Sequence, residues 1–278
     1  MAHHRFIRLL FFQFLIFNFQ FLYAQTYEQN ARAIISALAE DSLQKAELLI
    51  QETIHLDPER VSNAILYQYL GSIYQRQGKN DKALEAFDTG IAFSPTSKGL
   101  LLARASLHVQ LNRYERALDD YTTVLETEPN NEEALFFRAY VHTQLRHYKE
   151  ARADYRQLLE LNPMHEDGRL GLAILNSKDS RPHEALEQLD ALVQFFPTHA
   201  KHYLARCGMY EKRKEYEKAK KDVERALELE PENPECYLTR ASLYLALKKK
   251  QLANQDCRTA INLGASPEQV APILSAIK

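Results

Sequence analysis

The chain has 278 residues, 45% hydrophobic and 26% charged, a composition that can form the core of a folded protein. Its formal net charge is −2 and its isoelectric point about 6.6, which argues against the basic surface of a nucleic-acid-binding protein. Only 8 residues are glycine, which argues against glycine-rich phosphate loops and favours helices.

The first 24 residues differ in composition from the rest. Arg5 and Arg8 lead into an apolar stretch that ends at Phe21, and Ala24 precedes polar sequence. This layout is typical of a secretory signal peptide. We therefore predict a signal peptide over residues 1–24, cleaved after Ala24, and an exported protein that is periplasmic or associated with the cell envelope. An uncleaved anchor is the alternative, although the stretch is short and polar for a membrane span.

Prolines recur with a fixed period through the remaining sequence. Neighbouring prolines in the following series are each 34 residues apart: Pro95, Pro129, Pro163, Pro197 and Pro231. A period of this length indicates an array of similar helix pairs. Breaks at Gln77-Gly78 and Leu111-Asn112 divide each repeat into two helices.

One repeat carries a characteristic set of residues at family-specific spacing: Tyr67, Leu70, Gly71, Tyr74, Ala83, Phe87 and Pro95. In this pattern the chain resembles the tetratricopeptide repeat family. The resemblance implies an all-α fold, a right-handed superhelical α-solenoid of about seven helix pairs with a degenerate first pair. A small residue is expected where the two helices of each repeat meet: Gly71, Ala105, Ala139, Ala173, Cys207 and Ala241.

Aligned on the period, a tetratricopeptide domain occupies residues 25–278. The predicted repeats are 27–60 (degenerate), 64–97, 98–131, 132–165, 166–199, 200–233 and 234–265. Repeat 166–199 departs most from the family pattern, with Asn176 in place of an aromatic residue and Leu189 in place of phenylalanine. We expect a looser helix pair there.

The end of the chain is typical of a capping helix. Ser266 is followed by Pro267 and, three positions on, by Gln269, which together predict a helix start. The predicted helix covers residues 267–277. Its apolar residues recur at helical spacing and would cover the exposed face of the last repeat: Val270, Ile273, Leu274 and Ile277.

An arginine in the first helix and an aspartate 16 residues later occur together in four repeats: Arg104 with Asp120, Arg138 with Asp154, Arg206 with Asp222, and Arg240 with Asp256. Two repeats lack both residues, having Leu70 with Ala86 and Leu172 with Gln188. We therefore predict a structural ion pair within each of the four repeats. Pairing with the preceding repeat is disfavoured because Ala86 stands at the equivalent position before Arg104.

The sequence contains no motif of a known catalytic or ligand site, and we predict no enzyme, no catalytic residue, no cofactor and no metal site. Two pairs of histidines are interpreted as surface helix or turn residues rather than metal ligands: His142 with His147, and His199 with His202. The cysteines are interpreted as small packing residues: Cys207, Cys236 and Cys257.

The resemblance implies a concave groove formed by the first helix of every repeat, which in the family binds extended peptides or helices. Carried over by position, the groove residues are Gln68, Ser72, Leu102, Ser106, Phe136, Tyr140, Leu170, Ile174 and Leu204, with further groove positions at Gln75, Val109, Thr143, Ser177, Gly208, Glu211, Leu238, Ser242 and Leu245. The middle of this set is apolar and uncharged. It favours a partner held by apolar contacts, the alternative being that these side chains pack between neighbouring helices.

The function predicted from these features is that of an exported, non-enzymatic scaffold or adaptor that holds a peptide or helix of a partner protein. One alternative is a membrane-associated sensor or accessory subunit of an envelope complex, with the membrane involved only if the N-terminal segment is uncleaved. Another is a hydrolase with an unrecognised site. No nucleic-acid partner is predicted.

Overall fold

The computed structural model describes residues 25–277, so the predicted signal peptide and its cleavage after Ala24 lie outside the described residues. All regular secondary structure in 25–277 is helical, and the prediction of an all-α solenoid is confirmed. The first helix covers residues 25–39. It is followed by α2 (Leu43–Leu56), α3 (Asn63–Arg76), α4 (Asn80–Phe93), α5 (Lys98–Gln110), α6 (Tyr114–Thr127), α7 (Glu132–Gln144), α8 (Tyr148–Leu161), α9 (Glu166–Lys178), α10 (Pro182–Phe195), α11 (Ala200–Lys212), α12 (Tyr216–Leu229), α13 (Pro234–Ala246), α14 (Lys250–Asn262) and α15 (Pro267–Ile277).

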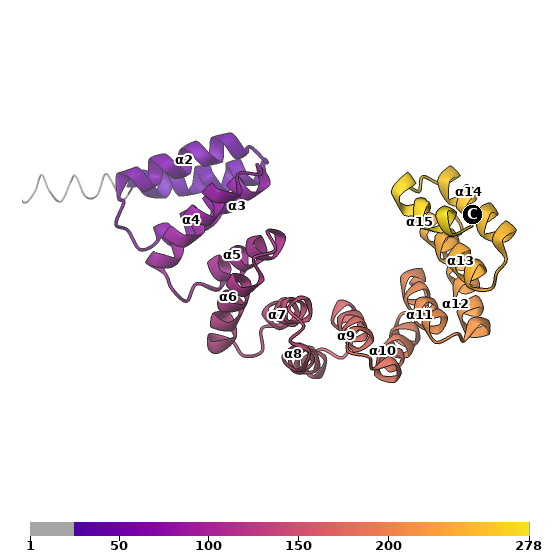
Figure 1. The fold of residues 1–278 in the computed structure, drawn as a ribbon. Helices are drawn as coiled ribbons and strands as arrows, with labels where there is room; N and C mark the ends of the chain where they lie inside the picture. The colour runs from indigo at the N-terminus through magenta and orange to yellow at the C-terminus, as the bar shows by residue number, and fades with distance from the viewer. Residues whose placement is uncertain (1–24, 278) are drawn as a thin grey trace, which may run out of the picture. The chain divides into compact units, whose positions relative to one another are not determined.

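The chain divides into two compact parts, and the division falls within α7, between Ala134 and Leu135. The first part contains the helix over 25–39 and helices α2 to α6, and the second contains α8 to α15. In each part, successive helices form antiparallel pairs stacked in chain order (Figure 1). Five first helices begin where the period places the start of a repeat: α5, α7, α9, α11 and α13.

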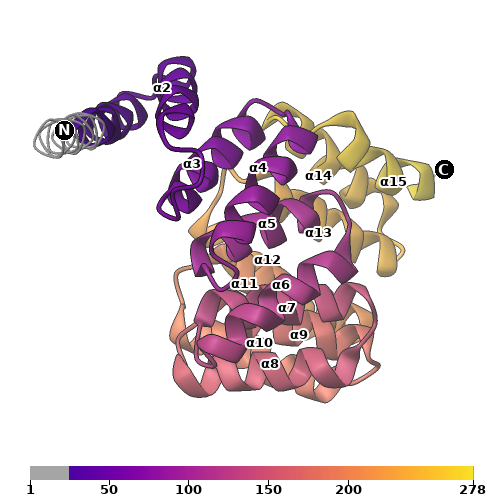
Figure 2. The ribbon, with the colours of Figure 1, turned by 90° about the vertical axis from the view of Figure 1, so that its left-hand side faces the viewer.

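The degenerate first repeat is a helix pair formed by residues 25–39 and α2 (Figure 2). Ile34 and Ile50 from these two helices are fully buried in the same hydrophobic core as residues of α3 and α4. The Tyr27 hydroxyl donates a hydrogen bond to Asn63 Oδ1 at 3.0 Å, and the Arg60 guanidinium lies 3.9 Å from the centre of the Tyr27 ring. This repeat is therefore fixed to the next one by apolar and polar contacts together.

The small residues predicted at the helix–helix contacts are all buried. A methyl group added at Gly71 would lie 2.4 Å from a carbon of the Phe87 ring. The three cysteines are buried free thiols, as predicted for packing residues. Burial raises the pKa of Cys207 to about 12 and that of Cys236 to about 11, so both thiols are protonated at neutral pH.

The turn between the two helices of each regular repeat contains one residue in the left-handed backbone region. These residues follow the 34-residue period, with φ between 56° and 73°: Gly78, Asn112, Arg146, Ser180, Lys214 and Lys248. The two positions singled out from the sequence, Gly78 and Asn112, are the residue types that adopt this conformation most readily. The other four show that the period, and not residue type, determines where the turn lies.

The C-terminal helix caps the last repeat as predicted. The Ser266 N–H donates to Gln269 Oε1 at 2.8 Å, and the Gln269 N–H donates to Ser266 Oγ at 3.4 Å, which is the reciprocal pattern of a capping box. Val270 is buried against Ala253, Cys257 and neighbouring residues of the last repeat. The other predicted apolar residues pack against the same cluster: Ile273, Leu274 and Ile277.

All four predicted arginine–aspartate pairs form. In each, the arginine Nε and Nη2 donate to the two carboxylate oxygens at 2.6–3.0 Å: Arg104 to Asp120, Arg138 to Asp154, Arg206 to Asp222, and Arg240 to Asp256. The four aspartates are buried and their arginines partly buried. Two tyrosines of the same repeat also flank the guanidinium of Arg240, with ring centres 5.4 and 5.9 Å away.

The prediction that this pairing stays within one repeat was too narrow. Arg104 Nη1 also donates to Asp88 at 2.6 Å, and Arg206 Nη1 to Asp190 at 2.8 Å, and both acceptors belong to the preceding repeat. Ala86 occupies the position equivalent to the buried aspartate. Asp88, two residues further on, is exposed and accepts a hydrogen bond from Arg104. Arg104 and Arg206 therefore join neighbouring repeats as well as the two helices of their own repeat.

The two repeats that lack the pair differ from each other. In repeat 166–199, Arg169 donates to Gln188 Oε1 at 3.0 Å and lies over the Phe195 ring, so an arginine one helical turn earlier takes part in an equivalent contact. Leu189 and Leu192 are buried in this repeat, which shows a packed interior where we expected a looser one. In repeat 64–97, a pocket of about 360 Å³ lies beside Leu70 and Ala86.

Candidate functional site

The second part of the chain contains an apolar groove between α9 and α11, with α13 at its edge. Its volume is about 520 Å³. Residues 170, 174 and 177 lie on one face of α9 because they are separated by four and three positions, and residues 204 and 208 lie on one face of α11 for the same reason. Half of the lining residues have apolar side chains: Leu170, Ala173, Ile174, Leu189, Leu204, Ala205 and Met209.

Three of the predicted groove residues, Leu170, Ile174 and Leu204, meet in this groove, together with Ser177 and Gly208. Ile174 is 47% exposed, which is unusual for a large aliphatic residue that only supports packing. No atom lies within 4 Å of the position that a Cβ of Gly208 would take, so this glycine leaves the space above α11 open.

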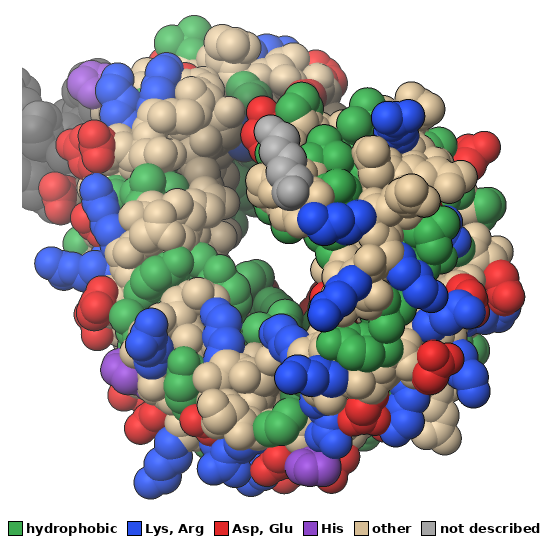
Figure 3. Space-filling model, turned by 45° about the vertical axis from the view of Figure 1, so that its right-hand side comes forward, with side chains coloured by type: hydrophobic (Ala, Val, Ile, Leu, Met, Phe, Trp, Pro, Cys, Tyr) green, Lys and Arg blue, Asp and Glu red, His purple; other side chains and the backbone are tan. Residues whose placement is uncertain are grey.

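The rim of the groove is basic, a feature the sequence analysis missed. Lys178, Lys201 and Lys212 line it, together with one acid, Glu235. Lys178 and Lys212 each follow a groove position, Ile174 and Gly208, by four residues, so helical spacing could have shown them. On the face drawn in Figure 3, the described acidic and basic side chains are interspersed over the surface.

Phe136 and Tyr140 lie in the second part but do not line this groove. The Phe136 ring stacks on His165 with ring centres 5.7 Å apart and meets the Tyr155 ring edge-on at 6.3 Å. These contacts support the alternative that Phe136 packs between neighbouring helices. Tyr140 is 36% exposed and stays a predicted contact residue.

The remaining predicted groove residues lie in the first part and are half-buried: Gln68, Ser72, Leu102 and Ser106. The Ser72 hydroxyl donates to the Gln68 carbonyl oxygen at 3.0 Å, one turn back in the same helix. Nearby, the Gln75 side chain donates to Gln110 Oε1 at 2.9 Å and joins the first helices of two repeats. This surface is polar, in contrast with the apolar groove of the second part.

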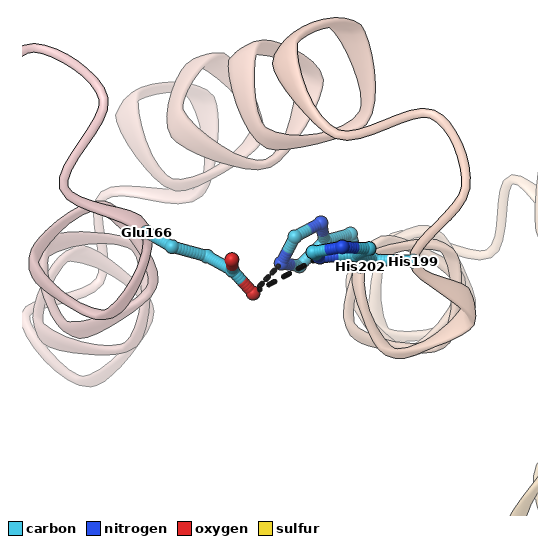
Figure 4. Close-up of side chains that lie close together, drawn as sticks. All are labelled: Glu166, His199 and His202. Carbon is cyan, nitrogen blue, oxygen red and sulfur yellow. Dashed lines mark hydrogen bonds and ion pairs between the residues drawn. The ribbon is translucent and has the colours of Figure 1, made fainter.

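A second cluster lies where α9 and α11 begin. His202 Nε2 is 3.0 Å and His199 Nδ1 is 3.3 Å from the same oxygen, Glu166 Oε1 (Figure 4). His202 is fully buried, so its interpretation as a surface residue was wrong, whereas the His199 side chain is 43% exposed. Lys201 also forms an ion pair with Glu166 Oε1.

The charges around Glu166 determine how the cluster ionises. Burial alone would raise the pKa of Glu166, but hydrogen bonds from Lys201 and His199 outweigh it, and the pKa is lowered. Burial lowers the pKa of His202, although the nearby carboxylate acts in the opposite direction. At neutral pH the cluster therefore contains a carboxylate beside a neutral, buried imidazole.

His142 and His147 also come together, with their Nδ1 atoms 3.4 Å apart. His147 is exposed and His142 half-buried, so the prediction of surface positions is correct for His147 and correct in part for His142. Within residues 25–277, one group of three or more histidine, cysteine or acidic side chains has its ligand atoms close enough to hold a metal, and it is Glu166, His199 and His202. None of the described helices has the length and apolar content that a membrane crossing requires.

The fold defines a helical repeat protein, in which paired helices stack into an all-α solenoid. Family models described as tetratricopeptide repeats match residues 64–97, 99–131, 132–165 and 209–233. Repeat 166–199, which departs most from the pattern, lies outside these ranges. A comparison with curated proteins finds none that is similar to this chain.

Solved structures with the same architecture include a tetratricopeptide repeat protein from Parabacteroides merdae. It is 28% identical to this chain, covers 91% of this chain and 99% of its own length, and has a TM-score of 0.74. YrrB, described as a tetratricopeptide repeat protein with an unusual peptide-binding site, is 19% identical, covers 69% of this chain and 97% of its own, with a TM-score of 0.55. The Cut9–Hcn1 assembly of the APC/C is 17% identical over 88% of this chain and 48% of its own, with a TM-score of 0.61.

Proposed function

We propose that this protein is a non-enzymatic interaction scaffold that holds a peptide or helix of a partner protein in the groove between α9 and α11. The observation that carries the proposal is the groove itself. Its aliphatic lining is accessible at Ile174 and open above Gly208, and these residues line one concave site. Exposed apolar surface in a concave site favours binding of an apolar ligand segment.

The chemistry of the groove describes the partner. Aliphatic side chains on its floor suit leucine, isoleucine, valine or methionine residues of the bound segment. Two rim lysines, Lys178 and Lys212, suit acidic residues beside them, whereas Lys201 is already paired with Glu166. We therefore infer a partner segment with alternating apolar and acidic residues.

Tetratricopeptide structures similar to this one support a role in binding. One is described by its unusual peptide-binding site and another is part of a multi-subunit assembly. At 19% and 17% identity these proteins share the fold with this chain, so the proposal depends on the groove of this chain and not on their partners.

Peptide selection against the purified full chain tests the proposal. We expect the selected peptides to carry apolar residues flanked by Asp or Glu, and Gly208→Phe to abolish binding by filling the groove. Lys178→Glu combined with Lys212→Glu should weaken binding at least tenfold, and should weaken it less at high salt. Lys149→Glu on α8 is the control for each substitution, since it replaces one lysine by glutamate outside the groove.

Two outcomes would reject the groove as the binding site. One is selection of no peptide by a chain that is folded by circular dichroism. The other is binding of the selected peptides to Gly208→Phe with the affinity of the original chain, provided that the variant melts at the same temperature.

We further propose that the scaffold acts outside the cytoplasm, because residues 1–24 have the pattern of a signal peptide. A membrane-associated sensor would keep this apolar segment. Sequencing the N-terminus of the protein from envelope and soluble fractions distinguishes the two: a start at Gln25 supports the exported scaffold, and an intact start in the membrane fraction supports the anchored sensor.

A further inference from the structure

The cluster of Glu166, His199 and His202 joins two neighbouring repeats at equivalent places. Glu166 is the first residue of α9, His199 immediately precedes α11, and His202 lies in the first turn of α11. The three side chains converge from two helices on one point (Figure 4). Side chains held by different helices are positioned by the packing of those helices, so their convergence is a property of the fold.

The distances match those of ligands around a small divalent cation. Zinc binds histidine nitrogen and carboxylate oxygen at about 2.0–2.1 Å, which places neighbouring tetrahedral ligands about 3.3 Å apart. Glu166 Oε1 is 3.0 Å from His202 Nε2 and 3.3 Å from His199 Nδ1. All three ligand atoms lie within 4.8 Å of one another. Small side-chain rotations would therefore complete three corners of a tetrahedron.

The surroundings hold both imidazoles in place. The Phe196 ring stacks on His199 with centres 5.5 Å apart and contacts His202 at 5.6 Å. His202 is fully buried, and its Nδ1 atom has no hydrogen-bond partner among the described residues. Coordination through Nε2 requires the proton on Nδ1, and no fixed partner there opposes that tautomer. The partial exposure of His199 leaves an approach for an ion and a water ligand.

Lys201 is the group that competes with a cation. Its ammonium forms an ion pair with the Glu166 oxygen that both histidines approach. The Lys201 side chain is 55% exposed, so it can move into solvent without breaking core contacts. A bound divalent ion would replace the positive charge that this lysine supplies.

We propose that Glu166, His199 and His202 form a binding site for one Zn²⁺ ion, with water as the fourth ligand. Two histidines and a carboxylate are a ligand set that zinc prefers, and the remaining position would be open. The ion would join the starts of α9 and α11, the two helices that line the groove. The proposal does not depend on what the groove binds.

Zinc titration of the full chain, purified without a histidine tag and stripped of metal, tests the site. We expect one Zn²⁺ per chain at this site and a higher melting temperature with zinc, because a ligand that binds only the folded state stabilises it. His199→Ala should weaken the affinity at least about tenfold. Lys201→Gln should tighten it, because the competing ammonium is removed.

His147→Ala is the matched control, since it removes a histidine from the other close pair, which has no carboxylate within ligand distance. It should leave the affinity unchanged, and Glu166→Gln should weaken it while circular dichroism reports an intact fold. The proposal is overturned if the folded chain binds no zinc with 1:1 stoichiometry. It is equally overturned if His199→Ala and Glu166→Gln bind zinc as tightly as the original chain.

Discussion

One arginine balances the charge of each buried carboxylate in the four pairs, at Asp120, Asp154, Asp222 and Asp256. Each accepts two hydrogen bonds from one guanidinium, and hydrogen bonding to Asp120 is the main cause that raises the pKa of Arg104. The sequence was sufficient to predict these pairs because arginine and aspartate are present or absent together. The second contact, from Arg104 to Asp88, could not be predicted in the same way, because Asp88 lies two positions away from the equivalent site.

Arg138→Ala should lower the free energy of unfolding by about 3 kcal/mol, because it leaves Asp154 charged, buried and without its bidentate partner. The double variant Arg138→Leu, Asp154→Ala reproduces the residue types found at Leu70 and Ala86. It should recover most of the loss, since no unpaired charge remains. Chemical denaturation of both variants measures the difference, and equal destabilisation would show that the buried charge is not the cause.

His108 should make the stability of the first part depend on pH. Burial lowers its pKa below the ordinary value of 6.5, with Arg104 and Arg113 acting in the same direction and Asp120 and Asp88 opposing them. The unfolded chain therefore binds a proton first, and the free energy of unfolding should decrease as the pH falls below 6.5. His108→Gln should reduce this slope. If the free energy of unfolding changes with pH between 7.5 and 5.5 as steeply in His108→Gln as in the original chain, His108 is not the cause.

Among the helices and turns, the 34-residue period predicted most of the structure. The starts of five first helices, the capping helix and the small residues at helix contacts follow from spacing that one sequence displays. The buried state of His202 did not follow, although a signal was present. Glu166 and His202 are 36 residues apart, close to one period, so they occupy neighbouring sites on successive repeats. To predict contacts between repeats, one must also ask which residues about 34 positions apart could bind each other.

The turn glycine and the groove glycine should respond in opposite directions to the same substitution. Gly78 has a φ of 73°, so Gly78→Ala should lower the free energy of unfolding by about 1 kcal/mol. Gly208 lies within α11 with open space around it, so Gly208→Ala should raise the free energy of unfolding by about 0.5–1 kcal/mol. Thermal and urea unfolding measure the change in the free energy of unfolding of each variant. A change of the same sign in both variants would contradict the account of the turns.

At the scale of the whole molecule, the resemblance to a repeat family predicted the fold but only part of the site. Leu170, Ile174 and Leu204 meet in one groove as their positions indicated. Phe136 instead packs on Tyr155 and His165 of its own repeat, so its ring lies against neighbouring helices and does not line the groove. Helical spacing could have shown the lysines of the rim, but Leu189 of α10 and Glu235 of α13 reach the groove through packing that a single sequence does not display.

Hydrogen exchange of the full chain, measured with and without a selected acidic and apolar peptide, tests the scaffold proposal most directly. The proposal predicts that the peptide slows exchange in α9 and α11 and leaves α12 unchanged, and that Gly208→Phe removes this protection. Protection confined to α10 and α12, or protection of α9 and α11 that persists in Gly208→Phe, would contradict it.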